Sequence, residues 1–590
     1  MPTASLPAPS LGNGLQPVWR RVVETLLIFV VFSLHGAWPV PDVNEAHYLS
    51  KAKHYWNPEW CKTDFFVNTA DAHQVFYWTF GWLTRFVSLP AAAWIGRLLT
   101  WGLLAFAWGR LSWAVVPRNW LVILGAVLFV SLNENAHMAG EWVVGGVEAK
   151  GFAYVLVLLG MEAVVRARWN WAWLFLGAAT GMHAIVGGWS IVAAGVAWLG
   201  NRAQGAMPAA PSGHASGEES QPKKHAHAKP STRHANPPLR RMLPGLLGGF
   251  LLALPGVWFA IALTHGADPQ TVAQADAIYV WQRLPHHLAA DHFQIGFPSR
   301  HMLLWVLWFV LITISPADGP QRRLRWMVST AMLLAAIGYA LVLVAHWNMT
   351  FATSLLRFYW FRMSDVFIPL GVTLVGLNWL RQTMGGGLQT VPTATNGSPN
   401  DSRADAASDA RSELGRLRAA RLWLAGLILV AGVDLAVQLE HLPPELACCG
   451  LPSVNPRADK GVVYDDWRAL CRWAGENTAP EACFITPRME STFRWYANRG
   501  GVVSWKDIPQ DAAGIVDWWH RLQDIWGMGT PAGTIKSLGM LSPQRLAQLA
   551  AKYRAEYAIV QLYPDVPRVP LKAVYENNSY AVYRFSGASK

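Results

Sequence analysis

The stretch Val22 to Trp38, VVETLLIFVVFSLHGAW, is followed within a few residues by Pro41-Asp42-Val43-Asn44-Glu45. An apolar segment of about 20 residues matches the hydrocarbon thickness of a bilayer. The residues after it are bulky or acidic, unlike the small residues of a signal-peptide cleavage site. The pattern therefore predicts a retained first membrane span that leads directly into a loop bearing two carboxylates.

Apolar segments of this kind recur along most of the chain. Of the 590 residues, 52% are hydrophobic and only 15% are charged, a balance that argues against a single soluble enzyme, a disordered chain, a β-barrel or a coiled coil. Many of the 33 tryptophans lie at the ends of apolar runs, where they anchor helices at the headgroup level. About 10–11 spans are expected at about 20 residues each: 22–39, 91–115, 119–133, 151–166, 171–200 as a hairpin of two short helices, 243–264, 299–315, 326–346, 353–380 and 421–439.

The net charge is +12, and the basic residues that produce it lie between the apolar segments. Arginines gather before the first span and in turns between later spans, and two long polar inserts carry more basic residues. If all of these lie on the cytoplasmic side, the positive-inside rule is satisfied. The basic excess thus indicates membrane topology and not nucleic-acid binding. It predicts a multi-pass protein of the inner (cytoplasmic) membrane with a cytoplasmic N-terminus and an extracytoplasmic C-terminus.

The expected fold is mainly α, a polytopic helical bundle with a C-terminal extracytoplasmic α/β domain. Its predicted parts are a cytoplasmic tail (1–21), the membrane domain (22–439) with outer loops 40–75, 133–150 and 265–298 and disordered cytoplasmic linkers 202–242 and 381–421, and the C-terminal domain (440–590). That domain alternates helical patterns at 465–476, 512–526 and 542–552 with short apolar runs at 483–486, 502–505, 557–562 and 580–585. All five cysteines fall on the outer side, and their pairing stays open.

Candidate chemistry begins in the first outer loop. Asp42 and Glu45 are three residues apart and share one helix face. One interpretation is a capping box, with Asp42 as N-cap and Glu45 at N3. The other is a functional site, because a helix N-terminus favours the ionised carboxylate that a general base or metal ligand requires.

The second and third outer loops add further polar residues. Glu141 and Glu148 lie near the bilayer, where acids are costly unless paired, hydrated or used, and Glu148 with Lys150 could form a charge pair at a helix start. The third loop carries Arg283, His286 and His287. Adjacent histidines point in different directions, so binding of a phosphate or a sugar hydroxyl by one of them is more plausible than joint chelation, and a plain hydrated loop is the alternative.

Charged residues also lie inside the expected span 353–380. At 100° per residue, Arg357, Arg362 and Asp365 fall within an arc of about 140°. An Arg362–Asp365 pair at i,i+3 would stabilise the helix in its bundle and leave Arg357 without a local partner. An unpaired arginine near the outer surface is suited to bind phosphate.

This arrangement resembles the GT-C class of integral-membrane glycosyltransferases: an inside N-terminus, a first span leading into an acidic outer loop, many further spans and an outer C-terminal α/β domain. The resemblance implies a polyprenyl-phosphate sugar as donor and a first-loop acid, Asp42 or Glu45, as base or metal ligand. In this chain the two acids are three residues apart and not adjacent, which leaves open which one acts. It further implies Glu141 or Glu148 as assisting ligands of a divalent metal ion, Mg²⁺ or Mn²⁺.

The implied reaction is attack by an acceptor hydroxyl on the sugar C1, with Asp42 or Glu45 as base and Arg357 and Arg283, beside His286 and His287, at the lipid phosphate. The expected partners are the lipid-linked donor and membrane lipids, and the acceptor is unknown. A transporter of a polar or anionic solute is the main alternative, and a non-catalytic scaffold of the cell envelope is another.

Overall fold

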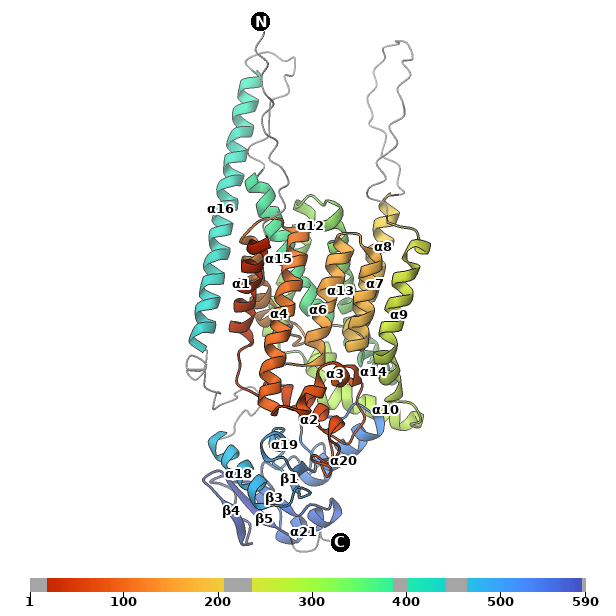
Figure 1. Cartoon of the computed structure of the whole chain (residues 1–590), viewed down its shortest axis with the longest axis vertical. Helices are drawn as coiled ribbons and strands as arrows, with labels where there is room; N and C mark the ends of the chain where they lie inside the picture. The colour runs from red at the N-terminus through yellow and green to blue at the C-terminus, as the bar shows by residue number, and fades with distance from the viewer. Residues whose placement is uncertain (1–17, 206–235, 386–400, 442–463, 586–590) are drawn as a thin grey trace.

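The computed structural model describes residues 18–205, 236–385, 401–441 and 464–585. Figure 1 shows long, roughly parallel helices that form a bundle, with the C-terminal domain at one end. We call that end the domain end and the opposite one the far end. The bundle helices are α1 (Val18–Gly36), α4 (Leu89–Val115), α5 (Leu121–Asn135), α6 (Ala149–Val165), α7 (Trp169–Met182), α8 (Ala184–Gly205), α9 (Leu239–Ala262), α12 (Gly296–Ile314), α13 (Gly319–Val344), α15 (Arg362–Gly385) and α16 (Asp401–His441).

The bundle confirms the predicted polytopic membrane fold. Seven of the described helices are long and apolar enough to cross a membrane: α4, α8, α9, α12, α13, α15 and α16. The shorter or more charged helices α1, α5, α6 and α7 pack among them. Each predicted span therefore overlaps a helix of the bundle.

The predicted hairpin at 171–200 corresponds to α7 and α8. The two helices separate at His183, which is extended, and a Cβ added to Gly187 would lie 2.1 Å from the backbone nitrogen of Thr180. Helix α7 also packs against α9 at glycine contacts, where a Cβ on Gly177 would lie 2.1 Å from the Gly249 carbonyl oxygen. Small residues at such crossings allow helix backbones to approach closely within a membrane.

The span predicted at 353–380 is interrupted, which corrects the sequence interpretation. Helix α14 (Met349–Leu356) ends before α15 begins at Arg362, and Tyr359 between them has a φ of 55°. The Trp360 indole donates a hydrogen bond to the Leu355 carbonyl across the turn. Arg357 and Arg362 consequently do not lie on one continuous helix.

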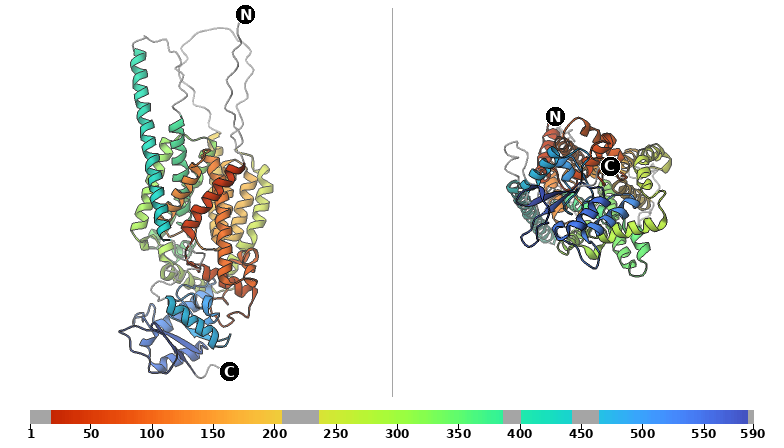
Figure 2. Two further views of the ribbon diagram at one scale, coloured as in Figure 1. Left: turned by 60° about the vertical axis from the view of Figure 1, so that its left-hand side comes forward. Right: turned by 90° about the horizontal axis from the view of Figure 1, so that it is seen from below.

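The linker predicted at 381–421 is also partly wrong. Helix α15 continues to Gly385, and α16 begins at Asp401, well before the expected span at 421. The alanine, arginine and leucine residues of 401–421 are good helix formers, and they extend the apolar helix beyond the bundle (Figure 2). In the other linker, helices α8 and α9 reach Gly205 and Leu239, and residues 206–235 lie outside the described ranges.

The C-terminal domain is α/β, as predicted. Its five-stranded mixed sheet has the order β2-β1-β3-β5-β4, with β1 parallel to β2 and β3, and β5 antiparallel to β3 and β4. The Ser542 hydroxyl accepts a hydrogen bond from the Arg545 backbone at the start of α21. The elements are α18 (Tyr464–Asn477), β1 (Cys483–Ile485), α19 (Phe493–Ala497), β2 (Gly500–Gly501), α20 (Ala512–Trp526), η6 (Leu538–Met540), α21 (Pro543–Lys552), β3 (Tyr557–Gln561), β4 (Ala573–Glu576) and β5 (Tyr580–Arg584).

Short helices of the outer loops lie between the bundle and this domain (Figure 1). The first loop supplies α2 (Glu45–Trp56), α3 (Gln74–Thr79) and η1 (Gly81–Arg85), and the third supplies α10 (Pro269–Ala277), η3 (Ile278–Arg283), α11 (Pro285–Leu288) and η4 (Ala290–His292). Cys61, Cys471 and Cys483 are buried, whereas Cys448 and Cys449 lie outside the described residues.

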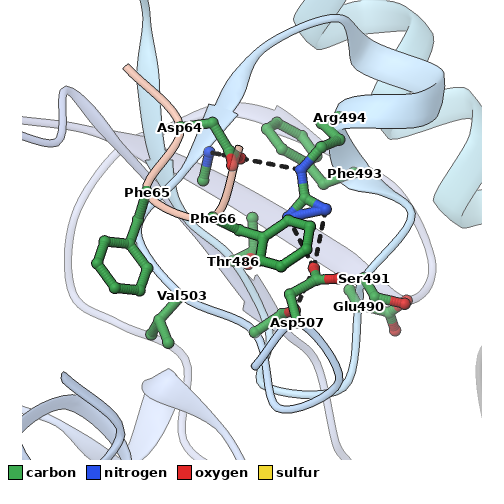
Figure 3. Close-up of a pocket in the computed structure, with 12 residues that line it drawn as sticks. Asp64, Phe65, Phe66, Thr486, Glu490, Ser491, Phe493, Arg494, Val503 and Asp507 are labelled. Carbon is green, nitrogen blue, oxygen red and sulfur yellow. Dashed lines mark hydrogen bonds and ion pairs between the residues drawn. The ribbon is translucent and has the colours of Figure 1, made fainter. Parts of the chain in front are cut away.

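A buried arginine joins the C-terminal domain to the first loop (Figure 3). Arg494 Nε lies 3.1 Å from Asp64 Oδ2, and its Nη2 lies 2.6 Å from Asp507 Oδ2. The Gly501 amide also donates to Asp64, and the Phe65 amide donates to the Gly501 carbonyl. The cavity beside these residues has a volume of only about 10 Å³. This region is therefore a domain joint and not a ligand site.

Candidate functional site

Glu45 is a structural residue of the first loop. The Glu45 amide donates to the Asp42 carbonyl, and the Glu45 carboxylate accepts a hydrogen bond from the Asp42 amide at 2.7 Å. Half of the predicted capping box therefore forms, because the Glu45 carboxylate binds the Asp42 amide, but helix α2 begins at Glu45 with Asn44 as its N-cap residue. The Asp42 carboxylate instead accepts from the Val43 amide and, across the chain, from the Gly146 amide.

The Glu45 carboxylate forms a two-pronged ion pair with Arg97 of α4. Arg97 Nε and Nη2 each lie 2.7 Å from a Glu45 oxygen, and both side chains are 0% exposed. The Val147 amide adds a fourth hydrogen bond to Glu45 at 2.9 Å. Every oxygen of this carboxylate thus already has two donors, which suits a positioning role and not proton transfer.

The first and second outer loops meet at Asp42. Asp42 Oδ2 accepts from the Gly146 amide at 3.0 Å, and a Cβ on Gly146 would lie 2.8 Å from both the Asp42 Cβ and the Glu45 Cγ. Only glycine fits so close an approach. The two acidic loops that the sequence indicated are therefore brought together at this point.

Lys150 lies between the two acids of the second loop. Its ammonium is 3.6 Å from Glu141 and 3.4 Å from Glu148. Glu148 also accepts from the Asn44 amide group, and burial raises its pKa, partly offset by Lys150 and Asn44. Glu141 accepts from the Tyr154 hydroxyl at 3.0 Å.

These two carboxylates do not fit a divalent metal ion. Protein donors already occupy their oxygens, and the ammonium of Lys150 lies where a cation would have to bind. Across the described ranges, no three histidine, cysteine, aspartate or glutamate side chains are grouped to hold a metal. We therefore derive no step through Mg²⁺ or Mn²⁺.

A cavity of about 500 Å³ opens at the domain end, and we call it the donor cavity. It lies where α2, α8, α9 and the turn between α14 and α15 approach residues of the C-terminal domain. One part of the wall is polar, and another part is apolar and belongs to α8 and α9. The polar lining includes Tyr48, His73, His183, Asp276, Arg357, Arg362 and Gln510, and the apolar lining includes Ile185, Trp189, Val192 and Leu263.

Two arginines reach the donor cavity from the two ends of the α14–α15 turn. Arg357 lies 2.6 Å from Asp276 of α10, and Arg362 lies 3.0 Å from Glu141 of the second loop. Their side chains are 26% and 13% exposed, respectively. Each guanidinium is thus held by one acid from a distant segment.

The predicted Arg362–Asp365 pair does not form. Asp365 accepts three backbone hydrogen bonds, from the amides of Met138, Ala139 and Glu141. These amides come from the second loop, which satisfies the buried carboxylate without a cation. The prediction that Arg362 is paired locally is consequently wrong, whereas Arg357 has no local partner and pairs instead with the distant Asp276.

A histidine of the first loop also faces the donor cavity. His73 Nδ1 lies 2.9 Å from Asp71 Oδ1, and its Nε2 lies 3.4 Å from the Tyr48 hydroxyl. Burial alone would raise the pKa of Asp71, but His73 and Lys51 outweigh it and the pKa falls below its usual range. The Asp71 carboxylate and the Gln510 amide group thus hold the His73 ring at the cavity wall.

The other predicted phosphate ligands lie away from the donor cavity. Arg283 donates to the carbonyls of Trp505 and Lys506 in the C-terminal domain. His287 Nδ1 contacts the Ala139 carbonyl, and its ring centroid lies 4.1 Å from that of the neighbouring His286 at a tilt of 44°. The structure therefore brings Arg357 to the cavity but not Arg283, His286 or His287, and Arg283 and His287 instead connect loops to other segments.

Lys506 is a residue of the C-terminal domain that sequence reasoning missed. Burial and the neighbouring Arg283 lower its pKa to about 8, while Asp42 and Glu148 act in the opposite direction. Lys506 is thus within electrostatic range of acids from both outer loops, although it lies more than 350 residues later in the chain. Arg97, His73 and Gln510 were also missed, because each lies in a sequence without a recognisable motif.

A family model described as a domain of unknown function, DUF6798, matches residues 465–525. No curated protein matches. Among solved structures, ArnT from Cupriavidus metallidurans bound to undecaprenyl phosphate is similar, with 14% identity, a TM-score of 0.42, and coverage of 96% of this chain and 97% of ArnT.

A second solved structure is similar over nearly the same range. It is the archaeal oligosaccharyltransferase AglB from Archaeoglobus fulgidus, in complex with an inhibitory peptide and a dolichol-phosphate. The identity is 11% and the TM-score 0.42, with 92% of this chain and 69% of AglB covered.

Proposed function

We propose that this protein is a GT-C-type membrane glycosyltransferase that moves a sugar from a polyprenyl-phosphate donor to an acceptor hydroxyl at the domain end of the bundle. The observation that carries the proposal is the donor cavity, where two acid-held arginines face an apolar wall. The acceptor is left open.

The lining of the donor cavity matches the two chemical parts of such a donor. Arg357 and Arg362 offer planar guanidinium groups that bind phosphate through paired hydrogen bonds. Val192, which also lines the cavity, is 42% exposed, so the apolar lining continues toward the outer surface of α8. An isoprenoid chain can lie against that surface while its phosphate contacts the arginines.

Asp276 and Glu141 position the two arginines before the donor binds. A guanidinium that is already oriented loses less side-chain entropy on binding. When the bond between the sugar C1 and the phosphate oxygen breaks, negative charge grows on the phosphate, and the two guanidinium groups stabilise it. Arg357 and Arg362 thus act together, in place of Arg357 alone.

A chain of polar contacts leads from the donor cavity to Asn44, which follows Asp42 in the first loop. Arg362 pairs with Glu141, and Lys150 bridges Glu141 and Glu148. Glu148 in turn accepts from Asn44, two residues after Asp42. We assign Asp42 as the base that removes the proton of the acceptor hydroxyl, and Glu45 with Arg97 as the pair that positions it. His73, which lines the cavity itself, is the competing candidate for the base.

Turnover of defined donors tests the proposal. Purified protein is incubated with a panel of polyprenyl-phosphate sugars, and release of polyprenyl phosphate is measured with and without added acceptor fractions. We expect turnover of at least one donor, a loss of ~10²-fold or more in Asp42→Asn, and normal turnover in Asp291→Asn, which removes a half-exposed acid of the third loop. A large loss in His73→Gln with normal Asp42→Asn would transfer the base role to His73.

The transporter and scaffold alternatives give different results in the same preparation. Liposomes containing the protein are loaded with small anionic and neutral solutes, and efflux is followed. Flux without turnover of any donor would favour transport, and neither activity would favour a scaffold.

A further inference from the structure

A second large cavity lies at the far end of the bundle, opposite the proposed glycosyltransferase site. It has a volume of about 530 Å³, within the range of roughly 300–1,000 Å³ that small-ligand sites occupy. We call it the far-end cavity. Its wall comes from α1, α4, α6 and the turn before α7, and it contains Arg21, Glu24, Thr25, Phe106, Gly109, Arg110, Trp113, Glu162, Arg166 and Arg168.

One buried acid, Glu162, positions two of the four arginines in this lining. Glu162, whose side chain is 4% exposed, accepts from Arg166 Nε at 2.6 Å and from Arg110 Nη2 at 3.1 Å. The second acid, Glu24, accepts from the Trp113 indole at 2.8 Å. The arginines of α4 and α6 are therefore fixed toward one point instead of extending separately into water.

The remaining two arginines carry charge that these acids do not neutralise. Among the residues that the structure describes, Arg21 and Arg168 have no ion pair and no side-chain hydrogen bond, and both are exposed. Four guanidinium groups thus face two carboxylates, and the cavity is positive overall. An anion is the ligand that this lining favours.

The arginines line an open space between the helices and do not simply lie on the surface at the helix ends. Gly109 lies in the middle of the wall, and a Cβ there would find its nearest neighbours, Ile28 and Thr25, only at 3.9 Å. Glycine in a helix interior costs about 1 kcal/mol relative to alanine, and here its small size leaves the cavity open. Next to it, Phe106 is 47% exposed and extends the wall to the apolar outer surface of α4.

We propose that the far-end cavity binds the phosphodiester headgroup of an anionic phospholipid, with the acyl chains lying along α1 and α4. Basic pockets between membrane helices recognise such headgroups, and guanidinium groups bind their phosphates through paired hydrogen bonds. The exposed apolar surface around Phe106 favours a lipid over a soluble phosphate. This site is independent of the proposed glycosyltransferase activity, because the two cavities lie at opposite ends of the bundle.

Lipid binding to the delipidated full-length protein tests the proposal. Native mass spectrometry gives apparent affinities for phosphatidylglycerol and phosphatidylcholine in a neutral detergent. The double variant Arg21→Gln/Arg168→Gln removes the unneutralised charge, and Gly109→Leu fills the cavity without changing charge. The matched control is Arg240→Gln/Arg241→Gln, which removes two exposed arginines from the far end of α9, outside the cavity.

We expect wild type to bind phosphatidylglycerol more tightly than phosphatidylcholine. Arg21→Gln/Arg168→Gln should weaken phosphatidylglycerol binding about 30-fold, the effect of two arginine charges beside an anionic lipid. Gly109→Leu should weaken it as well, and the control should not. Equal weakening in the control would mean that general surface charge, and not the cavity, causes the loss of binding, and it would overturn the proposal. Normal binding in Gly109→Leu, or displacement of the lipid by inorganic phosphate or glycerol 3-phosphate, would also overturn it.

Discussion

Substitutions of the two first-loop acids should damage different properties of the protein. Glu45→Gln should damage the fold, and Asp42→Asn should damage catalysis. The contacts of each carboxylate explain this difference. Glu45 accepts four hydrogen bonds, two of them from the buried Arg97. Asp42 accepts from two backbone amides, those of Val43 and Gly146.

The size of each effect follows from these contacts. Removing one partner of a buried ion pair leaves an uncompensated charge and costs about 3–5 kcal/mol, so Glu45→Gln should lower the free energy of unfolding by that amount. Asp42→Asn keeps one oxygen acceptor and leaves one buried amide without its partner, at a cost of about 1–3 kcal/mol. Its turnover should nevertheless fall by ~10²-fold or more if Asp42 is the base.

Thermal unfolding in detergent and donor turnover should be measured on the same preparations. Replacing both members of the pair, in Glu45→Gln/Arg97→Met, should recover part of the stability lost in Glu45→Gln, because no buried charge remains unpaired. The reasoning is refuted if Glu45→Gln unfolds at the wild-type temperature while its turnover collapses. That result would make Glu45 the acting acid.

Three other predictions concern the cavity arginines, Lys506 and the domain joint. Arg357→Lys and Arg362→Lys should each lower kcat/KM for the donor by roughly tenfold or more, because an ammonium cannot form the two-pronged phosphate contact. Wild-type kcat/KM in both variants would show that the donor phosphate does not bind in this cavity. Lys506→Met should unfold at a higher temperature than wild type at pH 7, since the folded-state pKa of about 8 lies below the ordinary lysine value and the charged form is disfavoured by folding. This advantage should shrink as pH rises from about 8 toward the ordinary lysine pKa, and a constant difference in unfolding temperature would contradict the assignment. Arg494→Met should cost about 3–5 kcal/mol and release the C-terminal domain to limited proteolysis, whereas the exposed Arg472→Met should not.

The apolar periodicity of the sequence was sufficient to predict the bundle and the α/β domain. It could not predict the break before Arg362, because the sequence LLRFYWF contains neither glycine nor proline and the turn depends on tertiary contacts. Strand β4 was missed because its residues alternate between half-buried and exposed at the edge of the sheet. Short apolar runs indicate only strands that are buried on both faces.

The sequence indicated where polar residues gather but not how they pair. Asp42, Glu141 and Arg357 were found because acids and arginines near apolar spans are costly and therefore conspicuous. Their partners are distant in the chain: Glu45 and Arg97 are 52 residues apart, and Glu141 meets Arg362 only in the folded bundle. Local spacing suggested the i,i+3 pair of Arg362 and Asp365 because it cannot detect backbone amides from another loop.

The joint between Asp64 and Arg494 has a consequence for how the protein is made. The two residues are separated by 430 positions, so at roughly 5–20 residues per second the first loop leaves the ribosome about 20–90 seconds before its partner does. During that interval the carboxylate of Asp64 and the aromatic residues around it have no domain to cover them. Biogenesis of this chain therefore requires the earliest outer loop to stay soluble and unaggregated until the last domain is synthesised, and variants that slow translation of the second half should be more sensitive to loss of chaperones than their stability would suggest.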